Sequence, residues 1–155
     1  MVLLDNVRSA LNVGSAFRTA VAFLVLELAL CGITAQPPHR EILKTAIGAS
    51  KSVDWRYFET TQAAIQHYRA QGFAILAVEQ AAGSTPLHQF KAVPQQPLLV
   101  VFGNEVMGVD QGVVDVADGC LEIPQFGTKH SFNVSVSMGM VLWHLFQGMR
   151  PDLLP

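Results

Sequence analysis

The segment Leu98–Val116, LLVVFGNEVMGVDQGVVDV, runs from five apolar residues through a turn with two glycines into a short helical stretch. A short run rich in Val and Leu is typical of a strand that is buried on both faces of a parallel sheet. Gly103 and Gly108 bracket Glu105 at the point where this strand would give way to the next helix. The segment therefore predicts a β–α unit, and with it an α/β fold.

The same alternation of strand and helix recurs along the chain. Further strands are predicted at 2–4, 25–31, 73–78 and 120–123, and helices at 14–23, 41–46, 61–71, 111–116 and 133–146, with loops at 37–38 and 83–86. A chain of 155 residues is long enough for one domain that buries roughly 70% of the surface of the unfolded chain. We expect a single domain over residues 1–155, with a mainly parallel sheet flanked by helices.

Composition narrows the class of protein. Half of the residues are hydrophobic and only 14% are charged, which excludes a disordered chain. The formal net charge is −2, so the overall charge does not indicate a nucleic-acid partner. Any RNA binding must come from a local basic patch.

The predicted C-terminal helix is apolar nearly all round. One stripe of side chains suits packing on a sheet, and a second stripe of Val136, Met140 and Trp143 faces elsewhere. In so small a domain this second stripe indicates burial against another subunit, so we expect a homodimer.

The two cysteines, Cys31 and Cys120, lie far apart in apolar runs. This placement favours reduced, buried thiols and a cytoplasmic protein. The absence of a CxxC or Cys/His cluster from the sequence suggests no metal site. The apolar run at 20–33 contains Glu27 and is shorter than the ~20 residues of a membrane span, so we expect no membrane association.

Polar residues and glycines gather in three segments, 6–18, 102–110 and 123–133, each after a predicted strand. Ligands of open α/β sheets bind beyond the carboxyl ends of strands, so these segments are expected to form one site. Each segment also has a plainer interpretation. Asn12 can be a helix cap with Arg18 a surface residue, Glu105 a solvated turn residue, and Ser131 or Asn133 the cap of the last helix beside a solvated His130.

Taken together, the three segments resemble the SpoU family of RNA 2′-O-ribose methyltransferases, in the SPOUT superfamily. The resemblance runs from Leu4 to about Leu145 and rests on Asn12 with Arg18, on Gly103-Asn-Glu-Val-Met-Gly108, and on Ile123-Pro124 with Ser131-Phe-Asn-Val-Ser-Val136. It implies an α/β fold with a deep C-terminal trefoil knot. It also implies a pocket for S-adenosylmethionine, lined by residues matching Val78, Gly103, Ile123 and Phe132.

The resemblance further implies roles for the polar residues. Arg18 would activate or position a ribose 2′-hydroxyl of tRNA or rRNA, and positioning is the safer expectation because a guanidinium is normally protonated. Asn12 and Glu105 would hold the substrate and the site, while Ser131 and Asn133 would orient the nucleotide and the loop. No metal would be required.

The sequence departs from the usual pattern of the family at three positions: Phe132 stands in place of a leucine, and Val21 and Leu24 stand in place of an acidic residue and a glycine. A separate RNA-binding domain is not expected, so RNA attraction falls to scattered basic residues: Arg8, Arg18, Arg40, Lys44, Lys51, Arg56 and Lys129. Two alternatives stay open, a knotted RNA-binding or assembly factor without catalysis, and a nucleotide-binding α/β domain of unrelated chemistry.

Overall fold

The computed structural model describes residues 1–128 and 131–154. It contains the strands β1 (Val2–Asp5), β2 (Glu27–Cys31), β3 (Asp54–Phe58), β4 (Ala74–Val78), β5 (Thr85–Pro86), β6 (Leu98–Phe102) and β7 (Gly119–Glu122). The helices are α1 (Ala10–Ala22), α2 (Arg40–Ala46), α3 (Thr61–Arg69), α4 (Gln111–Val116) and α5 (Val134–Met149), with short 3-10 turns at 49–51, 87–89 and 151–153. No described helix is long and apolar enough to cross a membrane.

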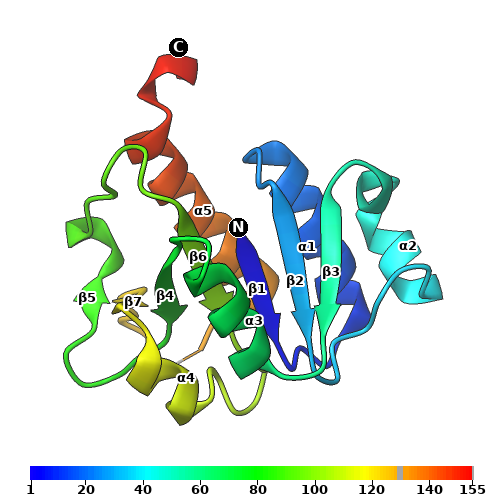
Figure 1. Ribbon diagram of the computed structural model, residues 1–155, viewed down its shortest axis with the longest axis horizontal. Coiled ribbons are helices and arrows are strands. Elements are labelled where there is room, and N and C mark those ends of the chain that lie inside the picture. Colours follow the sequence, from blue (N-terminus) through cyan, green and yellow to red (C-terminus); the bar gives the residue numbers. More distant parts are fainter. Residues whose placement is uncertain (129–130, 155) are drawn as a thin grey trace.

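The seven strands form one sheet in the order β3-β2-β1-β6-β4-β7-β5, and every pairing is parallel. Helices α1, α2 and α5 cover one face, and α3 and α4 cover the other (Figure 1). The central strands β1 and β6 are buried along their whole length, which explains why they are apolar throughout except for Asp5 at the end of β1. The predicted α/β class with a parallel sheet flanked by helices is confirmed, and the knot stays a prediction.

The predicted strands are present with bounds shifted by up to two residues, and two further strands were not predicted. The strand β3 was not predicted, because its sequence Asp-Trp-Arg-Tyr-Phe is charged and aromatic rather than uniformly apolar. Such a composition suits its place at one edge of the sheet. The strand β5 lies inside the predicted 83–86 loop and forms the other edge, where a proline is tolerated.

The start of α1 also differs from the prediction. The helix begins at Ala10 with Ser9 as its N-cap, and the Ser9 hydroxyl accepts a hydrogen bond from the Asn12 amide. Asn12 therefore lies inside the first turn and does not cap the helix, so its side chain is free for contacts elsewhere. Leu24 follows the end of this helix in the left-handed region, at a φ of 53°, a conformation that favours glycine.

Candidate functional site

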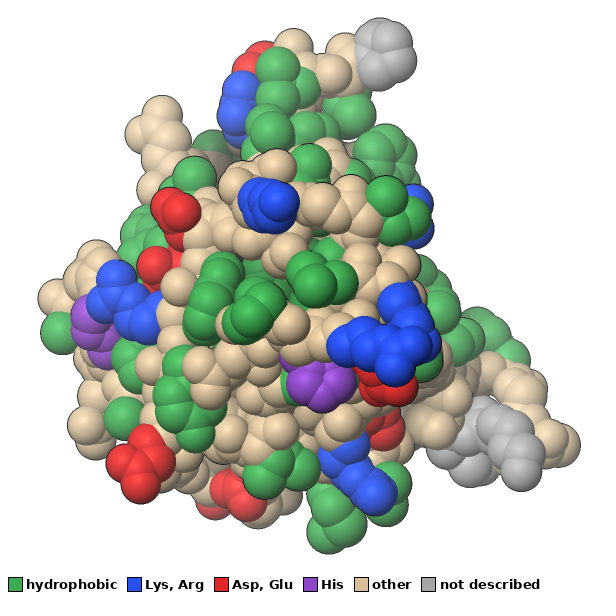
Figure 2. Space-filling model, turned by 90° about the vertical axis from the view of Figure 1, so that its right-hand side faces the viewer, with side chains coloured by type: hydrophobic (Ala, Val, Ile, Leu, Met, Phe, Trp, Pro, Cys, Tyr) green, Lys and Arg blue, Asp and Glu red, His purple; other side chains and the backbone are tan. Residues whose placement is uncertain are grey.

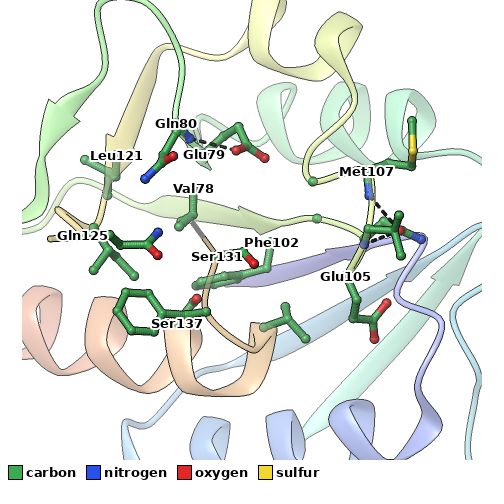
Figure 3. A pocket seen from close by; sticks show the side chains of 17 residues that line it. Val78, Glu79, Gln80, Phe102, Glu105, Met107, Leu121, Gln125, Ser131 and Ser137 are labelled. Carbon is green, nitrogen blue, oxygen red and sulfur yellow. Dashed lines mark hydrogen bonds between the residues drawn. The ribbon is translucent and has the colours of Figure 1, made fainter. Parts of the chain in front are cut away.

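A cavity of about 290 Å³ lies beyond the carboxyl ends of three adjacent strands, β6, β4 and β7. This is the expected place for a ligand in an open α/β sheet. Glu79 and Gln80 border one side of the cavity, and Ser131 and Ser137 border the opposite side (Figure 3). The residues predicted from the sequence that line it are Val78, Gly103, Glu105, Ile123, Ser131 and Phe132.

The loop after β6 brings main-chain groups to the cavity wall. A Cβ atom on Gly103 would lie only 2.1 Å from the carbonyl carbon of Gly108, so the close approach of the two backbones requires glycine at position 103. Asn104 and Gly108 exchange two backbone hydrogen bonds of 2.9 Å each. The Asn104 side-chain oxygen also accepts from the amides of Val106 and Met107. The loop is thus a closed turn that depends on its own backbone.

Glu105 points from this loop toward the start of α1. Its carboxylate accepts hydrogen bonds from the amides of Arg8 and Ser9, at 2.8 and 3.0 Å, and from Nδ2 of Asn12 at 3.0 Å. Partial burial raises the pKa of Glu105, but these hydrogen bonds to the charged form outweigh that effect and hold the pKa below its usual value. The carboxylate is therefore ionised at neutral pH and fixes the first polar segment against the second.

Asn12 joins the first polar segment to the third. Its Oδ1 accepts a hydrogen bond of 3.1 Å from Nδ2 of Asn133, while its own Nδ2 donates to Glu105. Asn133 is also the N-cap of α5, because its Oδ1 accepts from the Ser135 amide at 2.9 Å. Three side chains from distant parts of the sequence thus form one hydrogen-bonded chain.

Arg18 lies apart from this chain of contacts. It is exposed on α1 and is not among the described residues that line the cavity. His130 and Lys129, which the sequence also pointed to, lie outside the described residues. One protomer therefore brings together eight of the nine predicted site residues, six in the cavity wall and two through hydrogen bonds to it. Arg18 lies on an outer helix face.

Sequence reasoning missed several lining residues: Glu79, Gln80, Gln125 and Ser137. Glu79 follows Val78 directly at the end of β4, so the rule that ligands bind beyond carboxyl ends of strands could have found it.

The charges of the cavity restrict its ligand. Its described lining contains two carboxylates, Glu79 and Glu105, and no Lys or Arg. A triphosphate or dinucleotide site depends on cationic or glycine-rich phosphate contacts, which disfavours that class of ligand. Within residues 1–128 and 131–154, no group of three or more His, Cys, Asp or Glu is placed to hold a metal ion.

A parallel sheet with a loop-built cavity at its carboxyl edge defines an α/β protein that binds a small organic ligand. The sequence profile of the SpoU rRNA Methylase family matches residues 1–143, so the chain belongs to this family.

Known proteins resemble the chain over most of its length. It is 32% identical over 153 residues to the tRNA (guanosine(18)-2′-O)-methyltransferase of Thermus thermophilus, covering 98% of this chain and 75% of that one. The AdoMet-bound rRNA methyltransferase from Sinorhizobium meliloti superposes with a TM-score of 0.88 and 28% identity, covering 99% of this chain and 56% of that one. A tRNA (guanosine(18)-2′-O)-methyltransferase of Mus musculus, TARBP1, matches over 79 residues, which are 51% of this chain and 5% of that protein.

Proposed function

We propose that the protein is an S-adenosylmethionine-dependent methyltransferase that methylates a ribose 2′-hydroxyl in tRNA or rRNA. The observation that carries this proposal is the common cavity of Val78, Gly103, Ile123 and Phe132, joined at its rim to the Glu105–Asn12–Asn133 chain. Family membership and the activities for which the relatives are named support it.

The cavity suits S-adenosylmethionine in both chemistry and charge. Apolar side chains of Val78, Ile123 and Phe132 can cover an adenine ring, and main-chain groups of Gly103, which also lines the cavity, can hydrogen-bond to its edge. A lining with two carboxylates and no described Lys or Arg accepts a ligand of net positive charge. When bound, the cofactor supplies a methyl group that is already activated by its sulfonium, so the protein must chiefly align the reactants.

The polar residues then act by positioning. Asn12 and Glu105 fix the wall of the site, Asn133 fixes the start of α5, and Ser131 presents a hydroxyl at the cavity where a nucleotide could be oriented. Arg18 would hold the ribose or its phosphate as a donor, because a guanidinium stays protonated at neutral pH.

A homodimer would cover the apolar surface on the Arg18 side of the molecule. Leu11, Val21 and Leu24 are exposed in or beside α1, and Val136 and Trp143 are exposed on α5. The two helices are neighbours, with the rings of Phe23 and Trp143 centred 6.2 Å apart. If a second copy packs on this α1–α5 surface, Arg18 of one protomer would lie beside the cavity of its partner and complete the site there.

The dimer has a simple test. Sedimentation equilibrium should give twice the chain mass for the wild type, and Trp143→Glu should give a folded monomer because a charge is placed in the apolar contact. A monomeric wild type would refute this arrangement.

RNA binding is expected to be weak and salt-sensitive. Figure 2 shows the face beside β3 and α2, where Lys and Arg side chains are scattered singly among acidic and apolar ones. The described basic residues named from the sequence are all exposed, and Arg56 already pairs with Glu27 at 3.6 Å. Few phosphate contacts predict weak binding, which added salt weakens further, and a choice of nucleotide by RNA shape. The two free thiols support a reducing compartment, and hence the cytoplasm.

Calorimetric titration with S-adenosylmethionine tests the central proposal. Wild type should bind, and Phe132→Asp should not, because Phe132 lines the cavity. Phe126→Asp is the matched control, since Phe126 is 96% exposed and is not among the lining residues. RNAs would then be screened for 2′-O-methylation, beginning with guanosine 18 of tRNA, with Arg18→Ala as the inactive variant. A folded wild type that binds no cofactor would overturn the enzyme proposal and favour a non-catalytic RNA-binding factor.

A further inference from the structure

Glu79 connects three parts of the cavity wall. Its Oε2 accepts a hydrogen bond of 2.9 Å from the Val109 amide, and its Oε1 accepts one of 2.8 Å from the Gln80 amide. Its own amide donates to the carbonyl of Leu121 at 3.0 Å. One residue at the end of β4 thus touches β7 and the loop that follows β6.

The position of this carboxylate depends on Gly108. A Cβ atom at residue 108 would lie 2.1 Å from Oε2 of Glu79, and Gly108 has a φ of +70°, where side chains are rarely found. Glycine therefore admits the carboxylate against the loop. The contact is specific, since a larger residue at position 108 would push Glu79 away.

The two carboxylates of the cavity differ in what surrounds them. Glu105 is held by three donors, one of them the Asn12 side chain, and faces the start of α1. Glu79 meets two backbone amides, and no described Lys or Arg lines the cavity beside it. Its negative charge is therefore the less compensated of the two, and the field it creates extends into the cavity.

We propose that Glu79 is a specificity-determining residue that makes the cavity favour a cationic sulfonium ligand over the neutral thioether left after methyl transfer. This inference rests on the proposed methyltransferase function. Transfer removes the positive charge, because the electron pair of the broken carbon–sulfur bond stays on sulfur while the ribose oxygen gains the methyl group and loses its proton to solvent. The same carboxylate that favours the methyl donor therefore gives no such advantage to the spent product, which helps the product to leave.

The test compares two probes, S-adenosylmethionine and S-adenosylhomocysteine, by calorimetry on the full chain. Glu79→Gln keeps the size of the side chain and removes its charge, so it should weaken binding of the donor relative to the product by about five- to tenfold. Glu122→Gln is the matched control. Glu122 contacts the Ser84 hydroxyl at 2.7 Å and is not among the described lining residues, so the ratio of the two affinities should not change.

Each outcome decides between named alternatives. An equal loss of affinity for both probes in Glu79→Gln would show that Glu79 only braces the loops, and would refute its role in selectivity. If Glu79→Gln does not fold, Gln80→Lys places a cation on an exposed lining residue, and it must weaken the donor more than the product. A wild type that binds neither probe overturns the proposed function itself. A wild type that binds both probes, with variants whose ratio of the two affinities is unchanged, refutes only the role of Glu79.

Discussion

Replacing Gly103 with alanine should damage the cavity more than any other single methyl group added to the loop after β6. The new Cβ would lie 2.1 Å from the carbonyl carbon and 2.2 Å from the carbonyl oxygen of Gly108, and 2.2 Å from the Val109 amide nitrogen. Ordinary contact begins near 3.4 Å, and all three opposing atoms are backbone, so the loop must move by more than 1 Å. A misplacement of this size lowers the reaction rate of a site with positioned reactants by about a hundredfold, and overpacking lowers the free energy of unfolding by about 1–3 kcal/mol.

The assay is cofactor titration by calorimetry, together with urea unfolding of the same variant. Gly148→Ala is the control, because a Cβ there meets only the Ala92 side chain at 3.7 Å and lies in α5, where alanine favours the helix by up to about 1 kcal/mol. We expect Gly103→Ala to stay folded and to lose cofactor binding, while the control keeps it. Unchanged affinity in Gly103→Ala would refute the reasoning that this backbone contact shapes the site.

Three further predictions concern the site and the two thiols, of which Cys31 is buried and Cys120, against the expectation from the sequence, only partly buried. Asn133→Asp keeps the helix cap but loses the donor to Asn12, so methylation should fall by about tenfold or more while the free energy of unfolding changes by less than about 1 kcal/mol; full activity would contradict this. Because the pKa of Glu105 is lowered in the folded state, this residue adds stability above its ordinary pKa of 4.5, and that stability is lost as the pH falls through the lower folded pKa. Between those two values, the free energy of unfolding in urea should therefore depend less on pH in Glu105→Gln than in wild type. Burial raises the pKa of Cys31 to about 12 and also raises that of Cys120, so neither thiol should react with a disulfide reagent at pH 8 until the protein is unfolded; a fast native reaction would show that a thiol is accessible.

Local sequence patterns predicted most of the helices and strands. The bounds of β6 and α4 follow directly from the apolar run at 98–102 and the turn after it, since burial on both faces leaves a clear signal. Edge strands leave a weaker signal, because their outer side needs no apolar partner. That is why Asp54–Phe58 and Thr85–Pro86 were missed.

The site shows the same division between local and distant causes. Asn12 has the chemistry of a helix cap, and nothing nearby in the sequence says that Ser9 takes that role instead. The Asn12 side chain instead donates a hydrogen bond to Glu105, which lies ninety-three residues away in the sequence. Asn133 was correctly expected as one of two candidate caps, because its contact with Ser135 is local.

The placement of β1 bears on how the protein is made. Residues 2–4 pair on one side with β2, which leaves the ribosome soon afterwards, and on the other with β6, nearly one hundred residues later. The links from residues 8–12 to Glu105 and Asn133 span similar distances. Because synthesis runs from the N-terminus and distant contacts are slow to form, β1 has no partner on its β6 side until residues 98–102 have been made. A nascent chain stopped after β4 would expose that strand, so the period before β6 emerges is when this protein is most dependent on chaperones.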